Sequence, residues 1–335
     1  MWRSLSLTML QAEYRTERAC ELPEYLGSTV RGAFGEELHA RSCLEPDGPC
    51  ALCRQPDRCA SGALFDGPAD GEVRGLGVTN PSRGGSGGDR PRPYVLVAPP
   101  WRSVAYQPGE VIRVGLTLVG RARVWLPEVA SALAGMGTRG LGVDRQPWAL
   151  VRITAVRSDM SSVAIDSASA ATGQAIPQLE GPEIVAKAPP SAGQACLVFL
   201  TPADLKSHGQ RVDHLDGPGL FRRLIRRVGT LVESFCSPPL RGPFDYRTLA
   251  DLANQVVVAE QQVATVRWDR YSGRQRTKHP LSGLVGQAIV SNIPDPLWPY
   301  LILGQWVHIG KGASFGQGRY VVLPQPTASA SLVSQ

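Results

Sequence analysis

The sequence contains the same order of three elements twice: an apolar helix, a glycine-rich loop and a strand. Residues 124–136 are spaced as an amphipathic helix, which leads into glycines at 135, 137, 140 and 142 and then into a strand at 148–156. Residues 296–308 predict a second helix, which leads into the loop Gly310–Gly318 and a strand at 319–323. A repeat of this kind predicts two halves with the same fold.

The segments before each repeat complete the pattern. In each half a strand and a helix come first, at 4–14 and 24–40 and at 195–200 and 221–235. Two strand-like stretches lie between the helices of each half, at 94–98 and 111–119 and at 256–271 and 283–291. We therefore predict an α+β fold of two tandem ferredoxin-like (RRM-like, βαββαβ) domains. The predicted divisions are an N-terminal domain at 1–158 with a Cys-rich insertion at about 43–93, a linker or insertion at 159–193, a C-terminal domain at 194–325 and a tail at 326–335.

The composition is that of a folded, basic protein. Hydrophobic residues make up 43% and charged residues 19% of the 335 residues, so each half can bury a core. The net charge of +6 comes almost entirely from arginine, whose planar guanidinium matches phosphate oxygens and stacks on bases. The first residues alternate polar and apolar, unlike a signal peptide, and the most apolar run, at 297–309, is too short to span a bilayer. We expect a cytoplasmic protein that binds nucleic acid and no membrane.

Four of the seven cysteines form a cluster with the spacing C-x6-C-x2-C-x5-C, at Cys43, Cys50, Cys53 and Cys59. A C-x2-C pair places two thiolates around one tetrahedral ion, and the flanking cysteines can complete its shell. We expect a structural zinc ion in a small knuckle inserted in the first domain; the alternative is four reduced thiols. Four thiolates leave no open coordination position, so no catalytic metal is expected.

Two further features favour contact with phosphates. Residues Arg222, Arg223, Arg226 and Arg227 share one side of a predicted helix, and the basic run continues at Arg267 beside Trp268. The loop near the C-terminus combines four glycines with two cations, namely Gly310, Gly312, Gly316, Gly318, Lys311 and Arg319. Such a loop lets backbone N–H groups approach an anion. The alternatives are a solvated helix face, a turn without a ligand, or a nucleotide-dependent enzyme that uses this loop.

Two histidines are candidates for proton transfer near neutral pH. His39 ends the first helix, 14 residues after Tyr25 and close to Arg31 and Arg41. His308 ends the last helix, where the helix dipole would favour the protonated imidazole.

Assembled in order, these segments resemble a known family. The stretch Leu22–Gly35 resembles the first-helix motif of the repeat-associated RNA-binding (RAMP) superfamily of CRISPR systems. The pair Cys50 and Cys53 leading into Gly62–Phe65, and the stretch Phe199–Lys206, resemble the branch that processes precursor CRISPR RNA. The ending Gln305–Tyr320 is the most specific match. The resemblance extends over nearly the whole chain.

This resemblance implies a metal-independent endoribonuclease that binds repeat RNA and cleaves precursor CRISPR RNA. A ribose 2′-hydroxyl would attack the adjacent phosphate and leave 2′,3′-cyclic phosphate and 5′-hydroxyl ends. In the family a histidine near the end of the first helix does this work, often with a tyrosine before it and a lysine after it. The matching positions are His39 and Tyr25; the lysine is absent, and Arg41 or Arg31 would supply its charge. The alternatives are a non-catalytic guide-RNA-binding subunit of a CRISPR effector complex, assembled with other subunits, and a zinc-dependent nuclease.

Overall fold

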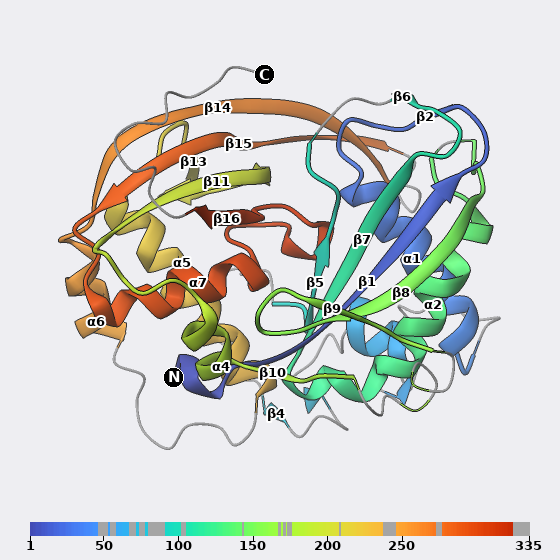
Figure 1. Cartoon of the computed structure of the whole chain (residues 1–335), viewed down its shortest axis with the longest axis horizontal. Helices are drawn as coiled ribbons and strands as arrows, with labels where there is room; N and C mark the ends of the chain where they lie inside the picture. The colour runs from blue at the N-terminus through green and yellow to red at the C-terminus, as the bar shows by residue number, and fades with distance from the viewer. Residues whose placement is uncertain are drawn as a thin grey trace.

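A computed structural model describes residues 1–45, 53, 58–66, 72–73, 78–79, 91–101, 105–142, 144–166, 169, 172, 176–207, 209–236, 246–272 and 277–323. Two antiparallel sheets, each covered by helices on one face, lie side by side (Figure 1). The α+β fold class predicted from the sequence is confirmed. Among the described residues, none of the helices has the length and apolar character that crossing a lipid bilayer requires.

The first half has the βαββαβ order of elements. These are β1 (Ser6–Thr16), α1 (Gly27–Ser42), β5 (Tyr94–Val97), β7 (Val111–Val119), α2 (Leu126–Arg139) and β8 (Trp148–Val156). The strands are arranged as β5-β7-β1-β8, so the first strand lies between the third and fourth, as in a ferredoxin-like sheet. The sheet is extended by β9 (Ser162–Ala164) beyond β8 and by β10 (Leu179–Glu180), which pairs with β1.

The second half repeats this arrangement. Its elements are β11 (Gln194–Ala203), α5 (Gly217–Phe235), β14 (Val257–Ser272), β15 (Thr277–Ser291), α7 (Trp298–Val307) and β16 (Tyr320–Leu323). The strand order β14-β15-β11-β16 is the same as in the first half. The smaller elements are η1 (Trp2–Ser4), β2 (Cys20–Glu21), η4 (Gly62–Asp66), β3 (Glu72–Val73), β4 (Val78–Thr79), β6 (Ala105–Tyr106), η5 (Gly120–Trp125), α4 (Gly181–Lys187), β12 (Lys206–Ser207), β13 (Gln210–Arg211), α6 (Tyr246–Ala253), η6 (Asp295–Leu297) and η7 (Ala313–Phe315).

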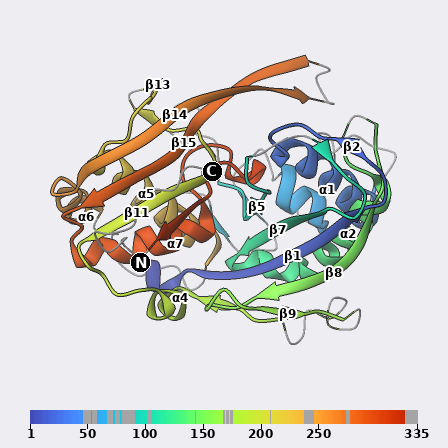
Figure 2. The ribbon, with the colours of Figure 1, turned by 45° about the horizontal axis from the view of Figure 1, so that its top comes forward.

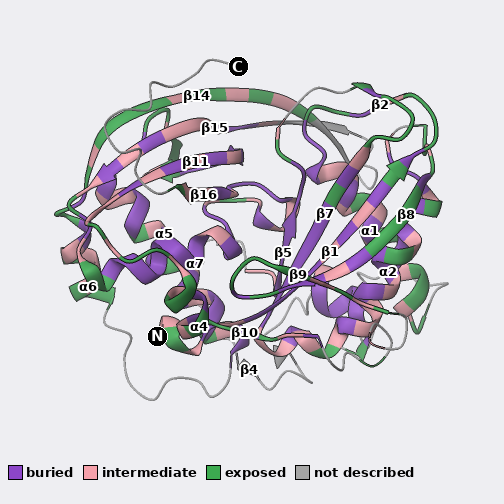
Figure 3. Ribbon diagram, viewed as in Figure 1, coloured by how far each residue is buried: buried purple, intermediate pink, exposed green. Residues whose placement is uncertain are grey.

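The two halves share part of one hydrophobic core. The core of the second half, built on α5 and α7, also contains Leu5, Leu7 and Met9 at the start of β1 and Val95 and Val97 of β5. The inner strands and the helix faces between the sheets are accordingly buried (Figure 3). Burying these apolar side chains removes them from water, so it favours a fixed arrangement of the halves.

The long hairpin of β14 and β15 reaches from the second half over the beginning of α1 (Figure 2). Near its end, the ring of Trp268 packs against Tyr25 at 5.2 Å and against Trp101 at 5.4 Å between ring centroids. These aromatic contacts join the hairpin to the first half.

Three sequence-based expectations need correction or completion. Gly135 and Gly137, expected in a loop, lie inside α2, where the side chains of Glu37 and Arg41 and the backbone of Trp148 approach too closely for a Cβ atom. The expected linker at 159–193 contains β9, β10 and α4. The zinc knuckle is not shown: Cys50 lies outside the described residues, and no metal-binding group of His, Cys, Asp or Glu is found within them.

Candidate functional site

His39 lies near the C-terminal end of α1 and is half-buried. The opposite stripe of the helix, with Val30, Phe34 and Leu38, is packed in the core of the first half. The carbonyl oxygen of His39 accepts a hydrogen bond from the N–H of Cys43 at 2.9 Å. Within the described part of the chain the imidazole itself has no hydrogen bond or ion pair, so it can exchange protons with a ligand.

A hollow of about 310 Å³ lies beside α1 on the same side as His39. It is lined by Gly32 and Glu36 of α1, by the turn Gly140–Gly142 and by Trp268 of the hairpin. Residues Gly32, Glu36 and His39 are spaced i, i+4 and i+7 along the helix, which places them on one face. A ligand in this hollow would therefore extend along α1 toward the imidazole.

An ion-pair network fixes the arginines around the end of α1. The buried carboxylate of Glu37 pairs with Arg41 at 2.6 Å and with Arg139 of α2 at 2.7 Å. Burial alone would raise the pKa of Glu37, but the hydrogen bonds from Arg139 and Arg41 hold it below its usual value. Arg41 also donates to the hydroxyl of Ser131 at 3.1 Å, which directs its guanidinium toward α2. The positive charge expected at Arg41 is present, but it is paired with the carboxylate of Glu37.

Tyr25, the second residue matched to the family's catalytic group, is 2% exposed. Its hydroxyl donates a hydrogen bond to the carbonyl oxygen of Phe315 at 2.5 Å. Burial raises the pKa of Tyr25 well above its usual value, so the phenol stays protonated. Phe315 also lies over the guanidinium of Arg31 in the second turn of α1, about 12 Å along the helix from His39 at 1.5 Å per residue. The structure thus separates Tyr25 from His39 and places it at the junction of the two halves.

The loop Gly310–Gly318 is tied to its surroundings through its backbone. The N–H of Lys311 donates to the carbonyl of Asp204 at 3.0 Å, and the N–H of Gly318 donates to that of Pro202 at 2.9 Å. Gly316 has a φ of 82°, and a Cβ atom added at this position would lie 2.7 Å from the Cβ of Ala98. Only glycine therefore fits there. These two N–H groups are used internally, whereas the side chain of Lys311 is exposed and can reach an anion.

The four arginines of α5 divide into two pairs. Arg223 donates to the carbonyl of Lys206 at 2.6 Å, and Arg227 donates to the carbonyl of Val307 at the end of α7 at 3.1 Å. Burial lowers the pKa of Arg227 to about 10. Arg222 and Arg226 are exposed, and Arg222 donates to Asn254 at 2.6 Å. The structure therefore leaves one pair, Arg222 and Arg226, on the surface.

His308 is fully buried between β16 and the halves' shared core. Its Nδ1 lies 3.2 Å from the carbonyl oxygen of Gln317, and its Nε2 has no partner among the described residues. Burial, then the charges of Arg319 and Arg227, lower the pKa of His308 well below its usual value. The sequence-based expectation of a protonated His308 is therefore wrong: desolvation outweighs the helix dipole.

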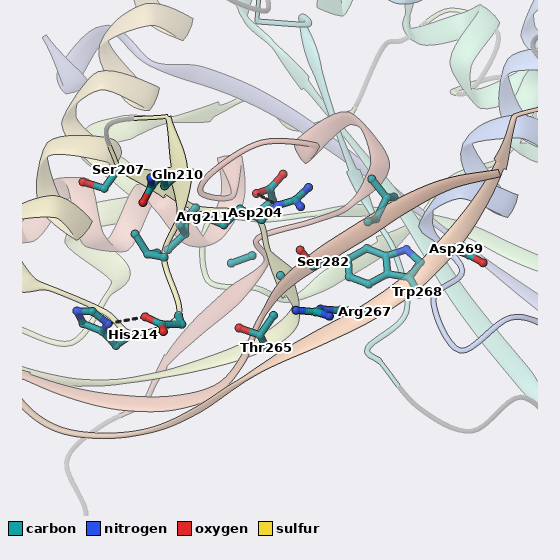
Figure 4. A pocket seen from close by; sticks show the side chains of 16 residues that line it. Asp204, Ser207, Gln210, Arg211, His214, Thr265, Arg267, Trp268, Asp269 and Ser282 are labelled. Carbon is teal, nitrogen blue, oxygen red and sulfur yellow. Dashed lines mark hydrogen bonds and ion pairs between the residues drawn. The ribbon is translucent and has the colours of Figure 1, made fainter. Parts of the chain in front are cut away.

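A groove of about 1070 Å³ lies between the β14–β15 hairpin and the segment 203–214 (Figure 4). Its polar lining includes Arg211, which pairs with Asp204 at 3.2 Å, and His214, which pairs with Asp213 at 2.7 Å. Arg267 lies exposed on β14 beside Trp268. The groove thus offers cations, carboxylates and an aromatic ring along one surface.

The sequence did not point to most of this groove. Arg267 and Trp268 belong to the basic run, but Asp204, Arg211 and His214 carry no spacing signal. They meet the hairpin only because β12 and β13 fold back beside β15, and a contact of this kind has no local periodicity.

The comparisons with known proteins agree with this geometry. A family model of the AF_1859 N-terminal domain matches residues 5–177, which is about half of the chain, and a model of the CRISPR-associated endoribonuclease Cas6 matches residues 197–320. No curated protein matches the sequence.

Several solved structures with a similar fold are Cas6 proteins or contain one. A Cas6 product complex has a TM-score of 0.56 and 17% identity, over 95% of this chain and 99% of that one. Thermus thermophilus Cas6 has a TM-score of 0.55 and 15% identity, over 95% and 99% of the two chains. A partial Cas6-RT-Cas1–Cas2 complex has a TM-score of 0.55 and 12% identity, over 98% of this chain and 48% of that one. The chain thus joins an N-terminal domain of the AF_1859 family to a domain of the CRISPR-associated Cas6 endoribonuclease family.

Proposed function

We propose that this protein binds CRISPR repeat RNA and cleaves precursor CRISPR RNA by metal-independent proton transfer at His39. The proposal rests on the burial and the pairing of the three histidines whose side chains are described. His308 is fully buried and His214 is paired with Asp213, whereas His39 is half-exposed and has no partner in the part of the chain that the structure describes. His39 is therefore the imidazole best able to move a proton to or from RNA.

The reaction would be attack by a ribose 2′-hydroxyl on the adjacent phosphorus. The 2′-oxygen loses its proton as the new P–O bond forms, and the 5′-oxygen gains a proton as its P–O bond breaks. The products are 2′,3′-cyclic phosphate and 5′-hydroxyl ends, with no water or metal consumed. His39 would carry one of these two protons, and proton transfer of this kind contributes ~100- to 10,000-fold to a rate.

The negative charge that develops on phosphorus needs a cation nearby. Around the end of α1, the carboxylates of Glu36 and Glu37 pair with three arginines, Arg41, Arg139 and Arg145. Two negative charges against three positive ones leave a net positive charge. Arg41, whose side chain is 42% exposed, is the member we propose for contact with the phosphate.

The RNA would approach through the groove of Figure 4 and the hollow beside α1. Both are lined by Trp268 and Asp269 of the hairpin, so a strand can pass from one to the other. Arg267 can contact phosphates in the groove, and Lys311, Arg222 and Arg226 are exposed on other elements of the second half. One structural neighbour is part of a Cas6-RT-Cas1–Cas2 complex, which supports association with further CRISPR proteins.

A structural zinc ion at Cys43, Cys50, Cys53 and Cys59 also remains a proposal. Cys59 is buried, its sulfur accepts a hydrogen bond from the N–H of Gly62 at 3.2 Å, and Cys43 and Cys53 lie close enough to raise its pKa after the effect of burial. The three described cysteines do not form a metal-binding group by themselves, so the proposal depends on Cys50 to complete the site. The ion would stabilise the end of α1 and would take no part in the reaction.

The proposal is tested by incubating the purified protein with 5′-labelled repeat RNA in excess EDTA. We expect one cut within the repeat, with a cyclic phosphate on the upstream product. Tight binding without cleavage would establish the alternative, a guide-RNA-binding subunit. Cleavage that EDTA abolishes and added metal restores would establish a metal-dependent nuclease.

A further inference from the structure

The groove of Figure 4 has more carboxylates than guanidinium groups in its described lining. The aspartates are Asp204, Asp213 and Asp269, and the arginines are Arg211 and Arg267. A surface that only follows the RNA backbone is lined by cations, because the phosphates are negative. Carboxylates instead accept hydrogen bonds from N–H groups, and unpaired RNA bases present such groups at their edges. The charge balance therefore favours contact with bases in this groove.

Asp204 differs from the two other aspartates because it is buried. Its side chain is 9% exposed, whereas Asp213 and Asp269 are exposed. Its Oδ1 accepts a hydrogen bond from Nε of Arg211 at 3.2 Å, and within the described part of the chain Oδ2 has no partner. The side chain nevertheless lines the groove, so a ligand can reach it. A carboxylate accepts up to about four hydrogen bonds, which leaves Asp204 with acceptor capacity for a ligand.

Arg211 presents unused donors beside this carboxylate. Its side chain is 47% exposed, and its hydrogen bond with Asp204 uses Nε, so Nη1 and Nη2 make no hydrogen bond to any described residue. Arginine and carboxylate groups frequently pair through two parallel hydrogen bonds. Here the side chains point toward one another but share a single bond, which leaves an oxygen and two nitrogens for a third group (Figure 4).

The backbone holds the pair in a fixed position. The carbonyl of Asp204, directly after β11, accepts a hydrogen bond from the N–H of Lys311 at 3.0 Å. Arg211 lies on β13, and the N–H of the next residue, Val212, donates to the carbonyl of Leu205 at 3.0 Å. Groups that are already in place lose little conformational entropy on binding, so this pair can discriminate between bases.

Guanine is the base whose edge matches these groups. Its Watson–Crick edge carries two adjacent donors, N1–H and the N2 amino group, beside the acceptor O6. Adenine, cytosine and uracil each have a single donor group on this edge. A carboxylate can accept from both donors of guanine while a guanidinium donates to O6.

We propose that Asp204 and Arg211 recognise a guanine in unpaired RNA that crosses the groove. Asp204 accepts hydrogen bonds from N1–H and the N2 amino group, and Arg211 donates to O6. The base lies against Leu205 and Leu281, which also line the groove, and Arg267 contacts a neighbouring phosphate. This inference rests on the RNA binding of the proposed function and does not depend on cleavage.

The test measures the affinity of the whole protein for short labelled RNAs by fluorescence anisotropy. The RNAs are heptauridylate and its variants with adenosine, cytidine, guanosine or inosine at the central position. We expect guanosine to bind roughly tenfold more tightly than uridine, adenosine or cytidine, because a well-placed bidentate contact discriminates by about 1–3 kcal/mol, or roughly 5- to 150-fold. Inosine lacks the N2 amino group and keeps O6, so it should bind several-fold more weakly than guanosine.

Two variants assign the contacts. Asp204→Asn should remove most of the preference for guanosine, because an amide presents one acceptor and one donor where guanine needs two acceptors. Arg211→Ala should weaken guanosine and inosine alike, because both carry O6. Asp251→Asn makes the same charge change on an exposed residue of α6, outside the groove lining, and should keep the preference.

Equal affinity of the wild type for all five RNAs, or no binding to any of them at high micromolar protein, would overturn the proposal. A guanosine preference that survives Asp204→Asn would overturn it too. If that variant does not fold, the inosine comparison in the wild type decides: equal affinity for inosine and guanosine means that no carboxylate contacts N2. A protein that cuts repeat RNA without preferring guanosine would keep the proposed function and lose this site, and one that prefers guanosine without cutting would do the reverse.

Discussion

The hydroxyl of Tyr25 donates a hydrogen bond to the carbonyl oxygen of Phe315, so the beginning of α1 is joined to the glycine-rich loop across 290 residues of sequence. The bond lies among the rings of Trp101 and Trp268, where water has little access. This position gives the tyrosine before α1 a structural role at the junction of the two halves.

Tyr25→Phe should therefore lower stability and leave cleavage nearly unchanged. Losing the hydroxyl leaves the Phe315 carbonyl without its donor, which costs about 1 kcal/mol. Denaturant unfolding measures the free energy, and a single-turnover assay with labelled repeat RNA measures the rate. Tyr14→Phe, which removes a hydrogen bond to Leu133 within the first half, is the control and should show a similar loss of stability. A rate that falls a hundredfold at unchanged stability would return Tyr25 to the proton-transfer site.

Protonation of His308 should destabilise the fold as the pH falls below about 6.5. Its pKa is lowered in the folded state because of burial and the nearby Arg319 and Arg227, so below about pH 6.5 the unfolded chain binds a proton that the folded chain does not. The free energy of unfolding then decreases with falling pH, by up to about 1.4 kcal/mol per unit from this residue. His308→Gln should lack this contribution. Parallel pH profiles for the variant and the wild type would contradict it.

The exposed pair on α5 should contribute to RNA affinity and not to stability. Replacing Arg222 and Arg226 by alanine removes two possible phosphate contacts, so the slope of log affinity against log salt should become shallower by roughly 1.4 to 1.8. The matched control is Arg227→Ala, which removes the donor to the Val307 carbonyl and should lower stability by about 1.5–3 kcal/mol. If the α5 pair leaves the slope unchanged and Arg267→Ala reduces it, the RNA lies in the groove alone.

The cysteine cluster should hold about one zinc ion per chain, by the tetrahedral four-ligand rule. Elemental analysis of purified, tag-free protein measures the content, and Cys59→Ser should reduce it. Chelation should lower the melting temperature, because the ion would fix the segment after α1, while cleavage at a temperature well below melting should continue in EDTA. Cys196→Ser, outside the cluster, is the control. Protein that contains no zinc would sink the proposal.

The sequence predicted the order of elements because that information is local. Apolar periodicity identified α2 and α7 and the strands after them, and the double occurrence of this order indicated two similar halves. Contacts between distant segments were not predictable in this way. The role of Gly137 depends on the backbone of Trp148, and the burial of Tyr25 depends on Phe315.

In the candidate site, too, local patterns were predictable and contacts between distant segments were not. Arg223 and Arg227 share a helix side with Arg222 and Arg226, yet they donate to carbonyls of Lys206 and Val307, which no helical spacing could reveal. His39 was identified by its place at the end of the first helix and by family resemblance. The structure adds that it is half-exposed and, in the described part of the chain, without a partner.

His39→Ala should reduce cleavage of repeat RNA ~100- to 10,000-fold and leave RNA affinity nearly unchanged. The imidazole would move a proton in the transition state, whereas affinity comes mainly from arginine and lysine contacts with phosphates. A single-turnover assay at saturating RNA measures the rate, and a filter-binding assay measures the affinity. The matched control is His214→Ala, since His214 is exposed and paired with Asp213 in the groove.

The control variant His214→Ala should change the RNA affinity at most and leave the cleavage rate unchanged, because His214 lines the groove proposed for RNA binding and not the hollow beside α1. His39→Gln should be as slow as His39→Ala, since glutamine keeps a polar side chain but cannot exchange a proton near neutral pH. If His39→Gln restores the rate, the imidazole only positions the RNA. If His39→Ala cuts normally while His214→Ala does not, proton transfer takes place in the groove of Figure 4 and its residues replace α1 as the active site.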